Sequence, residues 1–270
     1  PSATWRRRRR AVSQRQKTFL PMQCQDGPHA LGMRIPREKE GFSAREIERR
    51  AVAAGLPVEA IIGIVLTHEH GDHACGAPRL VQRLGVPLLT TQGTWNHLRP
   101  RMASAEHRPV ALLGSIEIGP FRLHTCPTSH DAVEPIALVV QTGDGLRIGV
   151  AYDLGRPTAA VRYLLSDLDA LVLEANHDEV LLRTNGYPAA VRQRIAGSGG
   201  HLSNRAAADL ITGLLHPGLG LIVLAHLSER CNSEGQARET VGEALAAAGY
   251  GGELHVARQD RPLPPLEIRR

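Results

Sequence analysis

The chain has 270 residues, of which 32 are basic, 27 acidic and 13 histidine, and 42% are hydrophobic. This composition is typical of a globular protein and excludes a disordered or collagen-like chain. Four cysteines without regular spacing do not make a disulfide framework, and no apolar run approaches the roughly 18 residues that span a bilayer, so we expect a cytoplasmic protein without membrane contact.

The net charge of +5 belongs to one end of the chain. Residues 1–40 hold ten basic and three acidic side chains, whereas residues 41–270 hold 22 basic and 24 acidic ones. The first 40 residues also show neither a period of 2 nor one of 3.6. We therefore divide the chain into an atypical basic segment, residues 1–40, and one folded domain, residues 41–270.

Regular patterns begin at residue 41. A capping box of Ser43 and Glu46 predicts a helix to residue 54, and a β-branched run predicts a buried strand over residues 61–67. A helix (74–84), a strand (88–91) and helical turns (95–102) follow. Two hairpins are then predicted, 115–118 with 122–125 and 135–141 with 146–151, the second around a Gly-Asp-Gly turn.

Helices and strands alternate in the remaining chain. The predicted elements are a helix (158–165), a strand (170–175), helices (189–195 and 203–215), a strand (219–225), a helix (233–248) and a strand (253–257). The strands outnumber those of a simple βαβ series. This arrangement predicts an α/β protein with two sheets and helices outside them, in one domain.

The most specific motif directly follows the predicted strand 61–67. His68, His70, Asp72 and His73 lie within six residues, and burying four such groups for structural reasons alone is costly. Imidazole and carboxylate side chains suit Zn, Mn or Fe. On a loop that leaves a strand, they can point at two neighbouring metal positions. A polar surface loop with coincidental histidines is the alternative, which this spacing disfavours.

A pair of metal ions needs more ligands than one loop offers. His130, Asp153 and His226 each lie just past a predicted strand, where a side chain projects from the edge of a sheet. A single residue in such a position more often caps a turn. Together with the first motif, these three residues are candidate metal ligands.

The order of these residues resembles the ligand series of the metallo-β-lactamase fold hydrolases. The resemblance covers residues 41 to about 260 and implies a four-layer αββα sandwich. It places His68, His70 and His130 on one divalent ion, Asp72, His73 and His226 on the other, and Asp153 between both. The ions would be Zn or Mn, and a metal-activated hydroxide would attack the substrate, with Asp72 and Asp153 as catalytic groups.

Four further stretches are similar to the YycJ (WalJ) subfamily of this family. They are Thr-Ser-His-Asp-Ala-Val-Glu-Pro (128–135), Leu-Glu-Ala-Asn-His-Asp (173–178), Gly-His-Leu-Ser-Asn (200–204) and Leu-Ala-His-Leu-Ser-Glu-Arg-Cys-Asn (224–232). Members of the subfamily are described as DNA exonucleases that act from the 5′ end. The resemblance therefore implies a nuclease, with DNA favoured over RNA as the substrate.

The residues around position 200 also suit a phosphodiester. Gly197 to Gly200 lead into a helix whose predicted N-cap is Ser203 or Asn204, and free N–H groups at such a position bind anions. A flexible loop with an ordinary cap is the alternative. His201 is a candidate proton donor to the leaving oxygen.

Two more residues are candidates for contact with the substrate. Asn176 either lines the cleft or orients the metal ligands. Arg230 either contacts a phosphate or pairs with Glu229 or Glu234.

Two positions in the sequence distinguish this chain from other hydrolases of the same fold. Thr-Ser-His-Asp around His130 departs from the pattern of glyoxalase II-like thioesterases, and Asp153 stands where zinc β-lactamases tend to carry Cys. A ribonuclease of the RNase Z type stays open. A metal-free binding module is disfavoured by the complete ligand series.

The start of the chain lacks one feature of the family. Two strands and an Asp-x-Gly turn should precede Gly41, but Glu38-Lys39-Glu40 stands there. We hypothesise that residues 1–40 are an out-of-frame or chimeric read-through, which the coding DNA would test. If the segment is native, the first sheet lacks its opening hairpin, and we expect low stability or an inactive fragment.

Overall fold

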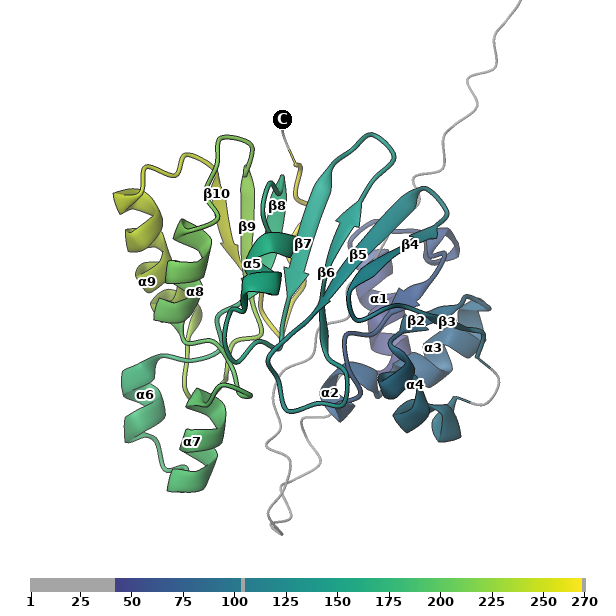
Figure 1. The fold of residues 1–270 in the computed structure, drawn as a ribbon, viewed down its shortest axis with the longest axis horizontal. Coiled ribbons are helices and arrows are strands. Elements are labelled where there is room, and N and C mark those ends of the chain that lie inside the picture. The colour runs from purple at the N-terminus through teal and green to yellow at the C-terminus, as the bar shows by residue number, and fades with distance from the viewer. Residues whose placement is uncertain (1–41, 103–104, 269–270) are drawn as a thin grey trace, which may run out of the picture.

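Two β-sheets of unequal size organise the described residues, 42–102 and 105–268, of the computed structural model (Figure 1). The smaller sheet has the order β1-β2-β3 and is parallel: β1 (Ile64–Val65), β2 (Leu88–Thr90) and β3 (His107–Pro109). The larger sheet has the order β10-β9-β8-β7-β6-β5-β4. The predicted basic segment, residues 1–40, lies outside the described residues.

The larger sheet combines the two predicted hairpins with a parallel half. Its strands are β4 (Gly114–Ile118), β5 (Phe121–Pro127), β6 (Ile136–Gln141), β7 (Arg147–Ala151), β8 (Ala170–Glu174), β9 (Leu221–Ala225) and β10 (Glu253–Val256). Neighbours from β4 to β7 pair antiparallel, and neighbours from β7 to β10 pair parallel. As a result, β5, β7, β8 and β9 all end at the same edge of the sheet.

Helices cover the outer faces of both sheets (Figure 1). The helices are α1 (Ala44–Ala53), α2 (Gly71–Ala74), α3 (Ala77–Leu84), α4 (Gln92–Leu98), α5 (Ala159–Leu164), α6 (Glu179–Thr184), α7 (Ala189–Ala196), α8 (Asn204–Thr212) and α9 (Glu234–Ala247), with single turns at Val58–Ala60 and Arg99–Arg101. Of these, α6 and α7 lie at the edge of the molecule and not over a face of either sheet. No helix within the described ranges combines the length and apolar character that crossing a bilayer requires.

Alternating side chains in the parallel strands build the layers. Leu171 and Leu173 of β8 pack with α5, α8 and α9, whereas Val172 faces the inner side of the sheet. On that side, Val65 of β1 and Leu89 of β2 pack against the antiparallel strands. The order is therefore helices, large sheet, small sheet and helices. The predicted α/β sandwich of two sheets in a single domain is confirmed.

The C-terminal segment covers the part of the inner face that the small sheet does not reach. Leu263, Leu266 and Ile268 pack against Leu221 and Val223 of β9. The inward-facing residues of β9 are thereby shielded from water by the chain that follows β10.

The structure differs from the predicted elements where the chain makes close approaches. The predicted strand 61–67 pairs regularly only at Ile64–Val65, because β1 meets β2 over two residues. The predicted helix 74–84 is divided between α2 and α3 at Gly76, where a Cβ atom would overlap the carbonyl oxygen of Phe42. The sequence patterns missed β3 and α6, which are short.

Candidate metal centre

The first four candidate ligands come from the turn between β1 and α2. His68 and His70 follow the strand, and α2 begins after His70, so that Asp72 and His73 lie in its single turn. The Thr67 hydroxyl lies 3.0 Å from Nδ1 of His68, which leaves Nε2 of that ring directed at the site. The single turn of α2 thus directs Asp72 and His73 differently from His68 and His70, which follow the strand directly.

The other candidates arrive at the same place because their strands end at one edge of the large sheet. His130 follows β5, Asp153 follows β7, and His226 follows β9. His226 has a positive φ of 58°, a conformation that is uncommon for a residue with a side chain. The structure therefore brings together all seven residues that the sequence analysis proposed as ligands.

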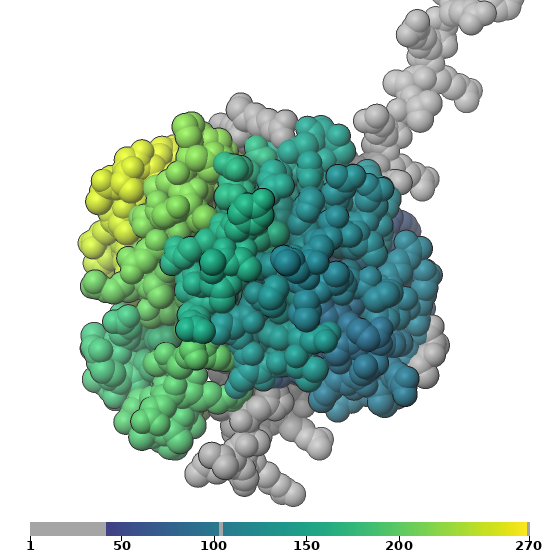
Figure 2. Space-filling model, in the orientation of Figure 1, coloured from purple at the N-terminus to yellow at the C-terminus, as the bar shows by residue number. Residues whose placement is uncertain are grey.

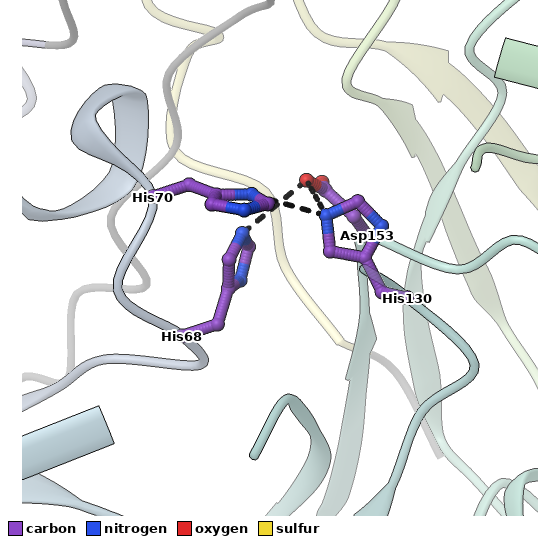
Figure 3. Close-up of side chains that lie close together, drawn as sticks. All are labelled: His68, His70, His130 and Asp153. Atoms are coloured by element: carbon purple, nitrogen blue, oxygen red, sulfur yellow. Dashed lines mark hydrogen bonds and ion pairs between the residues drawn. The ribbon is translucent and has the colours of Figure 1, made fainter. Parts of the chain in front are cut away.

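The seven side chains form two groups that share Asp153. The first group is His68, His70, His130 and Asp153, and the second is Asp72, His73, His226 and Asp153, with the candidate ligand atoms of each group within 4.8 Å of one another. Figure 3 shows the first group, in which His68 and His70 approach from one side and His130 and Asp153 from the other.

The carboxylate of Asp153 lies between the two groups. Its Oδ2 is 3.4 Å from Nε2 of His68, 3.2 Å from Nε2 of His130 and 3.3 Å from Nε2 of His73. Its Oδ1 is 3.2 Å from Nε2 of His226. Each carboxylate oxygen therefore faces imidazole nitrogens, as a ligand shared by two ions would.

The hydrogen bonding of these atoms fits a pair of metal ions. Nε2 of His68, Nε2 of His73 and Oδ1 of Asp153 are buried and take part in no hydrogen bond within the described residues. Buried polar atoms are normally hydrogen-bonded, and unsatisfied ones are costly. At least one histidine nitrogen in each group and an oxygen of the shared carboxylate are thus left without a hydrogen-bond partner, and such atoms are the ligands that a divalent cation of the zinc or manganese type requires.

The pKa values of the clustered side chains are shifted by burial and by one another. Burial and the nearby His73 lower the pKa of His68 to about 3, so this ring is neutral. Burial also opposes a charge on His73, but the carboxylates of Asp153 and Asp72 outweigh it and raise the pKa of His73 well above its ordinary value. Asp153 remains ionised, because His226 and His73 lower its pKa well below the ordinary value despite burial. An ionised Asp153 thus lies beside a protonated His73.

A buried carboxylate that the sequence analysis did not propose supports this cluster. Glu174 ends β8, and its Oε1 lies 2.7 Å from Nδ1 of both His201 and His226. Its Oε2 accepts hydrogen bonds from the backbone N–H groups of Leu154 at 2.8 Å and Leu202 at 3.2 Å. Burial disfavours its charge, but the two histidines prevail and lower the pKa of Glu174 to about 2.

Glu174 therefore orients one candidate ligand, His226, and one candidate acid, His201. It holds His226 through Nδ1, so that Nε2 faces Asp153. It holds His201 in the same manner, and the ring centres of His201 and His226 are 5.2 Å apart. A third cluster of possible ligands, Asp153, Glu174, His201 and His226, is explained by these hydrogen bonds.

The glycine-rich loop differs from its prediction. The N–H of Gly200 donates to Gly197, and the N–H of His201 donates to Ile195, so these groups are not available for an anion. The loop instead presents carbonyl groups: Gly200 accepts from Nδ1 of His130 at 3.1 Å. Because the glycines follow the carboxyl end of α7, this end of a helix offers acceptors and not donors.

Three of the predicted substrate contacts have partners inside the protein. Nδ2 of Asn176 donates to the carbonyl of His226 at 3.0 Å. The Ser203 hydroxyl accepts from the N–H of Ala206 as the N-cap of α8, and Asn204 is buried against Asn232. These partners favour positioning roles over contact with phosphate.

Arg230 differs from those three residues, because it is exposed at the protein surface. Its guanidinium lies 5.4 Å from the centre of the Tyr187 ring. Glu234, one of the two carboxylates predicted as partners of Arg230, lies 3.4 Å from Arg238 and 3.2 Å from Arg258.

The fold and the clustered histidines and carboxylates define a metal-dependent hydrolase. The family model described as the β-lactamase superfamily domain matches residues 41–226, and the chain therefore belongs to this superfamily and has the metallo-β-lactamase fold. The family predicted from the ligand series is confirmed.

The chain is also similar to individual proteins of this superfamily. The chain is 28% identical to exodeoxyribonuclease YycJ of Bacillus anthracis, over 85% of this chain and 88% of the relative. It is 27% identical to exodeoxyribonuclease WalJ of Streptococcus pneumoniae, over 78% of this chain and 80% of the relative. The crystal structure of the metallo-β-lactamase fold protein YhfI from Bacillus subtilis superposes with a TM-score of 0.60 at 16% identity, covering 88% of this chain and 94% of YhfI.

Proposed function

We propose that this protein is a metal-dependent nuclease that removes nucleotides from the 5′ end of DNA. The observation that carries the proposal is the pair of ligand groups around Asp153 with the Glu174–His201 pair beside them. Similarity to exodeoxyribonucleases over most of the chain supports DNA as the substrate.

The residues around Asp153 would hold two divalent cations. His68, His70 and His130 would bind one, Asp72, His73 and His226 the other, and Asp153 both. When bound, the cations would activate water and neutralise the charge of a phosphodiester. Nδ1 of His130 is fixed by the Gly200 carbonyl, and Nδ1 of His226 is fixed by Glu174, so both rings keep Nε2 in place.

His201 would supply the proton that the leaving oxygen needs. Its Nδ1 is held by the ionised Glu174, so proton exchange with a substrate takes place at Nε2. Glu174 stabilises the protonated ring and fixes its orientation, as a carboxylate beside a histidine does in acid–base catalysis. Phosphodiesters of DNA have poor leaving groups, for which such a proton donor matters.

The first test combines metal analysis with digestion of three substrates. We expect close to two Zn or Mn ions per chain and progressive release of nucleotides from 5′-phosphorylated duplex or single-stranded DNA. RNA cleavage in preference to DNA would support an RNase Z-like activity instead. Hydrolysis of thioesters or β-lactams by a metal-loaded protein that cleaves no nucleic acid would refute the proposal.

A second test isolates the role of His201. His201→Ala should lower kcat on DNA by about 10²–10⁴-fold, the contribution of general acid catalysis. The same variant should cleave bis(p-nitrophenyl) phosphate at close to the wild-type rate, because p-nitrophenolate leaves without a proton. The control is His97→Ala on the exposed face of α4. Equal losses on both substrates would show that His201 does not act as the acid.

A further inference from the structure

The helices α6 and α7 form a hairpin at the edge of the molecule (Figure 1). Figure 2 shows the same residues as a lobe at the lower left, beside the residues of the central sheet. The eight residues of α7 include none that is buried, and its apolar Val191 and Ile195 are only half-buried. Packing in the core therefore does not explain why the chain builds this helix.

Both ends of the hairpin are attached to loops of the metal centre. Asn176, which donates to the carbonyl of His226, lies two residues before Asp178, the N-cap of α6. After α7, the Gly200 carbonyl accepts from Nδ1 of His130. The hairpin thus leaves the centre beside one candidate ligand and returns beside another, so a polymer bound at the centre would pass along it.

The hairpin carries positive charge on a domain that is otherwise slightly negative. Residues 178–205 hold four arginines and two carboxylates, whereas residues 41–270 as a whole hold 22 basic and 24 acidic side chains. Arg183 at the end of α6 and Arg205 at the start of α8 are exposed. Among the described residues, neither forms an ion pair.

An aromatic ring in the turn of the hairpin, Tyr187, lies next to two guanidinium groups, Arg192 of α7 and Arg230 of the loop after β9. Arg192 donates to the carbonyl of Tyr187 at 2.5 Å, and Arg230 lies over the Tyr187 ring. Arg194 is different, because Asp131 pairs with it at 2.6 Å and neutralises it. Tyr187 is therefore bordered by cations that no carboxylate in the described residues neutralises.

The two carboxylates of the hairpin accept hydrogen bonds from neighbouring groups of the protein. Asp178 accepts from the N–H groups of Val180 and Leu181 at 2.9 and 2.8 Å as a helix cap. Glu179 accepts from the Ser203 hydroxyl at 3.0 Å. The charge presented to solvent is thus set mainly by the arginines.

We propose that the hairpin surface, defined as Arg183, Tyr187, Arg192, Arg205 and Arg230, binds the sugar-phosphate backbone of the DNA strand next to the bond that is cleaved. Guanidinium groups contact phosphates, and an aromatic ring stacks on a base, which are the two interactions that hold single strands. The helix α7, about 12 Å long, spans about three nucleotide steps at 3.4 Å each. This inference rests on the proposed nuclease function.

The test compares a long and a short substrate with a double variant. Arg183→Gln/Arg205→Gln keeps the aliphatic part of both side chains and removes two charges. At 0.1 M salt, each lost phosphate contact weakens binding of a single strand about 5-fold, so KM for 5′-phosphorylated single-stranded DNA should rise about 25-fold. The salt dependence of kcat/KM should become shallower by about 1.4. Hydrolysis of bis(p-nitrophenyl) phosphate, which is too small to reach the hairpin, should stay at the wild-type rate.

The matched control is Arg162→Gln. Arg162 is exposed on α5 and lies beside Gly213, at the end of α8 opposite Arg205. It should leave KM for DNA and its salt dependence unchanged.

Each contrary result has a separate meaning. An unchanged KM for DNA in the double variant would overturn the hairpin surface and leave the nuclease function standing. Equal loss on DNA and on the small diester would also overturn it, because the arginines would then support the metal centre itself. A metal-loaded wild-type protein that cleaves the small diester but no DNA would overturn the proposed function and the hairpin surface together.

Discussion

Replacing Glu174 by Gln is expected to disrupt the hydrogen bonds that hold His201 and His226 while preserving the shape of the side chain. In the wild type, Oε1 faces Nδ1 of His201 and of His226 at 2.7 Å, and Oε2 faces two backbone N–H groups. An amide has one oxygen and one NH₂ group. Whichever way Gln is oriented, its NH₂ group meets either the two histidines or the two backbone donors.

The size of the effect follows from these contacts. Two hydrogen bonds to a charged, fully buried group are lost or inverted, and each contributes about 1.5–3 kcal/mol. If the amide NH₂ faces His226, Nδ1 of that ring becomes an acceptor and the proton moves to Nε2, the atom that lies 3.2 Å from Asp153. A protonated Nε2 cannot bind a metal. We expect metal affinity to fall by about 10–100-fold, the usual effect of losing a partner of a metal ligand.

Calorimetric titration of the metal-free protein and metal content after dialysis measure this loss directly. The matched control is Glu179→Gln, because exposed Glu179 accepts, within the part of the chain that the structure describes, a single hydroxyl hydrogen bond. Wild-type affinity for both ions together with wild-type activity in Glu174→Gln would refute the assigned role of Glu174. Loss of activity with full metal content would restrict that role to His201.

Three other predictions concern the bridging carboxylate, the proton balance and a close contact. Asp153→Ala should abolish both metal occupancy and activity, and elemental analysis that finds two ions still bound would show that Asp153 does not bridge them. Because the pKa of His73 is raised well above its ordinary value, this ring is protonated at pH 7 without metal, so binding should release about one proton and strengthen as pH rises towards that pKa. Titrations in buffers of different ionisation enthalpy count the proton, and equal affinity at pH 6 and pH 8 would contradict this expectation. Gly155→Ala should destabilise the protein by about 1–3 kcal/mol, because its Cβ would overlap the Ser198 carbonyl. Chemical unfolding measures this change against Gly186→Ala, a position with nothing within 4 Å of the added atom, and equal stability of the two variants would be the contrary result.

The seven candidate ligands could be predicted from the sequence, because their residue types and their positions after strands are local features. Four of them lie in one turn after an apolar strand, and no ordinary packing role explains so many ionisable groups there. The others each follow a strand that periodicity predicts. Parallel strands end at a common edge, so residues just past β7 and β9 had to approach each other once the strand directions were fixed.

The position of Glu174 in the sequence already indicates a functional or buried polar role. It ends the apolar strand β8, where a carboxylate is costly unless it has buried partners. The sequence could not name those partners, because His201 and His226 are 27 and 52 residues away. Only the juxtaposition of three loops pairs them.

For the glycine-rich loop, the local sequence pattern gave a wrong prediction. Glycines before a helix indicate free N–H groups when the helix that follows is the only neighbour considered. In the folded chain, the same loop closes α7, and its carbonyl groups meet the loop of His130. The candidate metal ligands were predictable from residue type and from position after a strand, both of which are local properties of the chain. The tertiary structure decided which of their second nitrogens are held, and by what, because those hydrogen bonds join segments whose relative orientation no local pattern specifies.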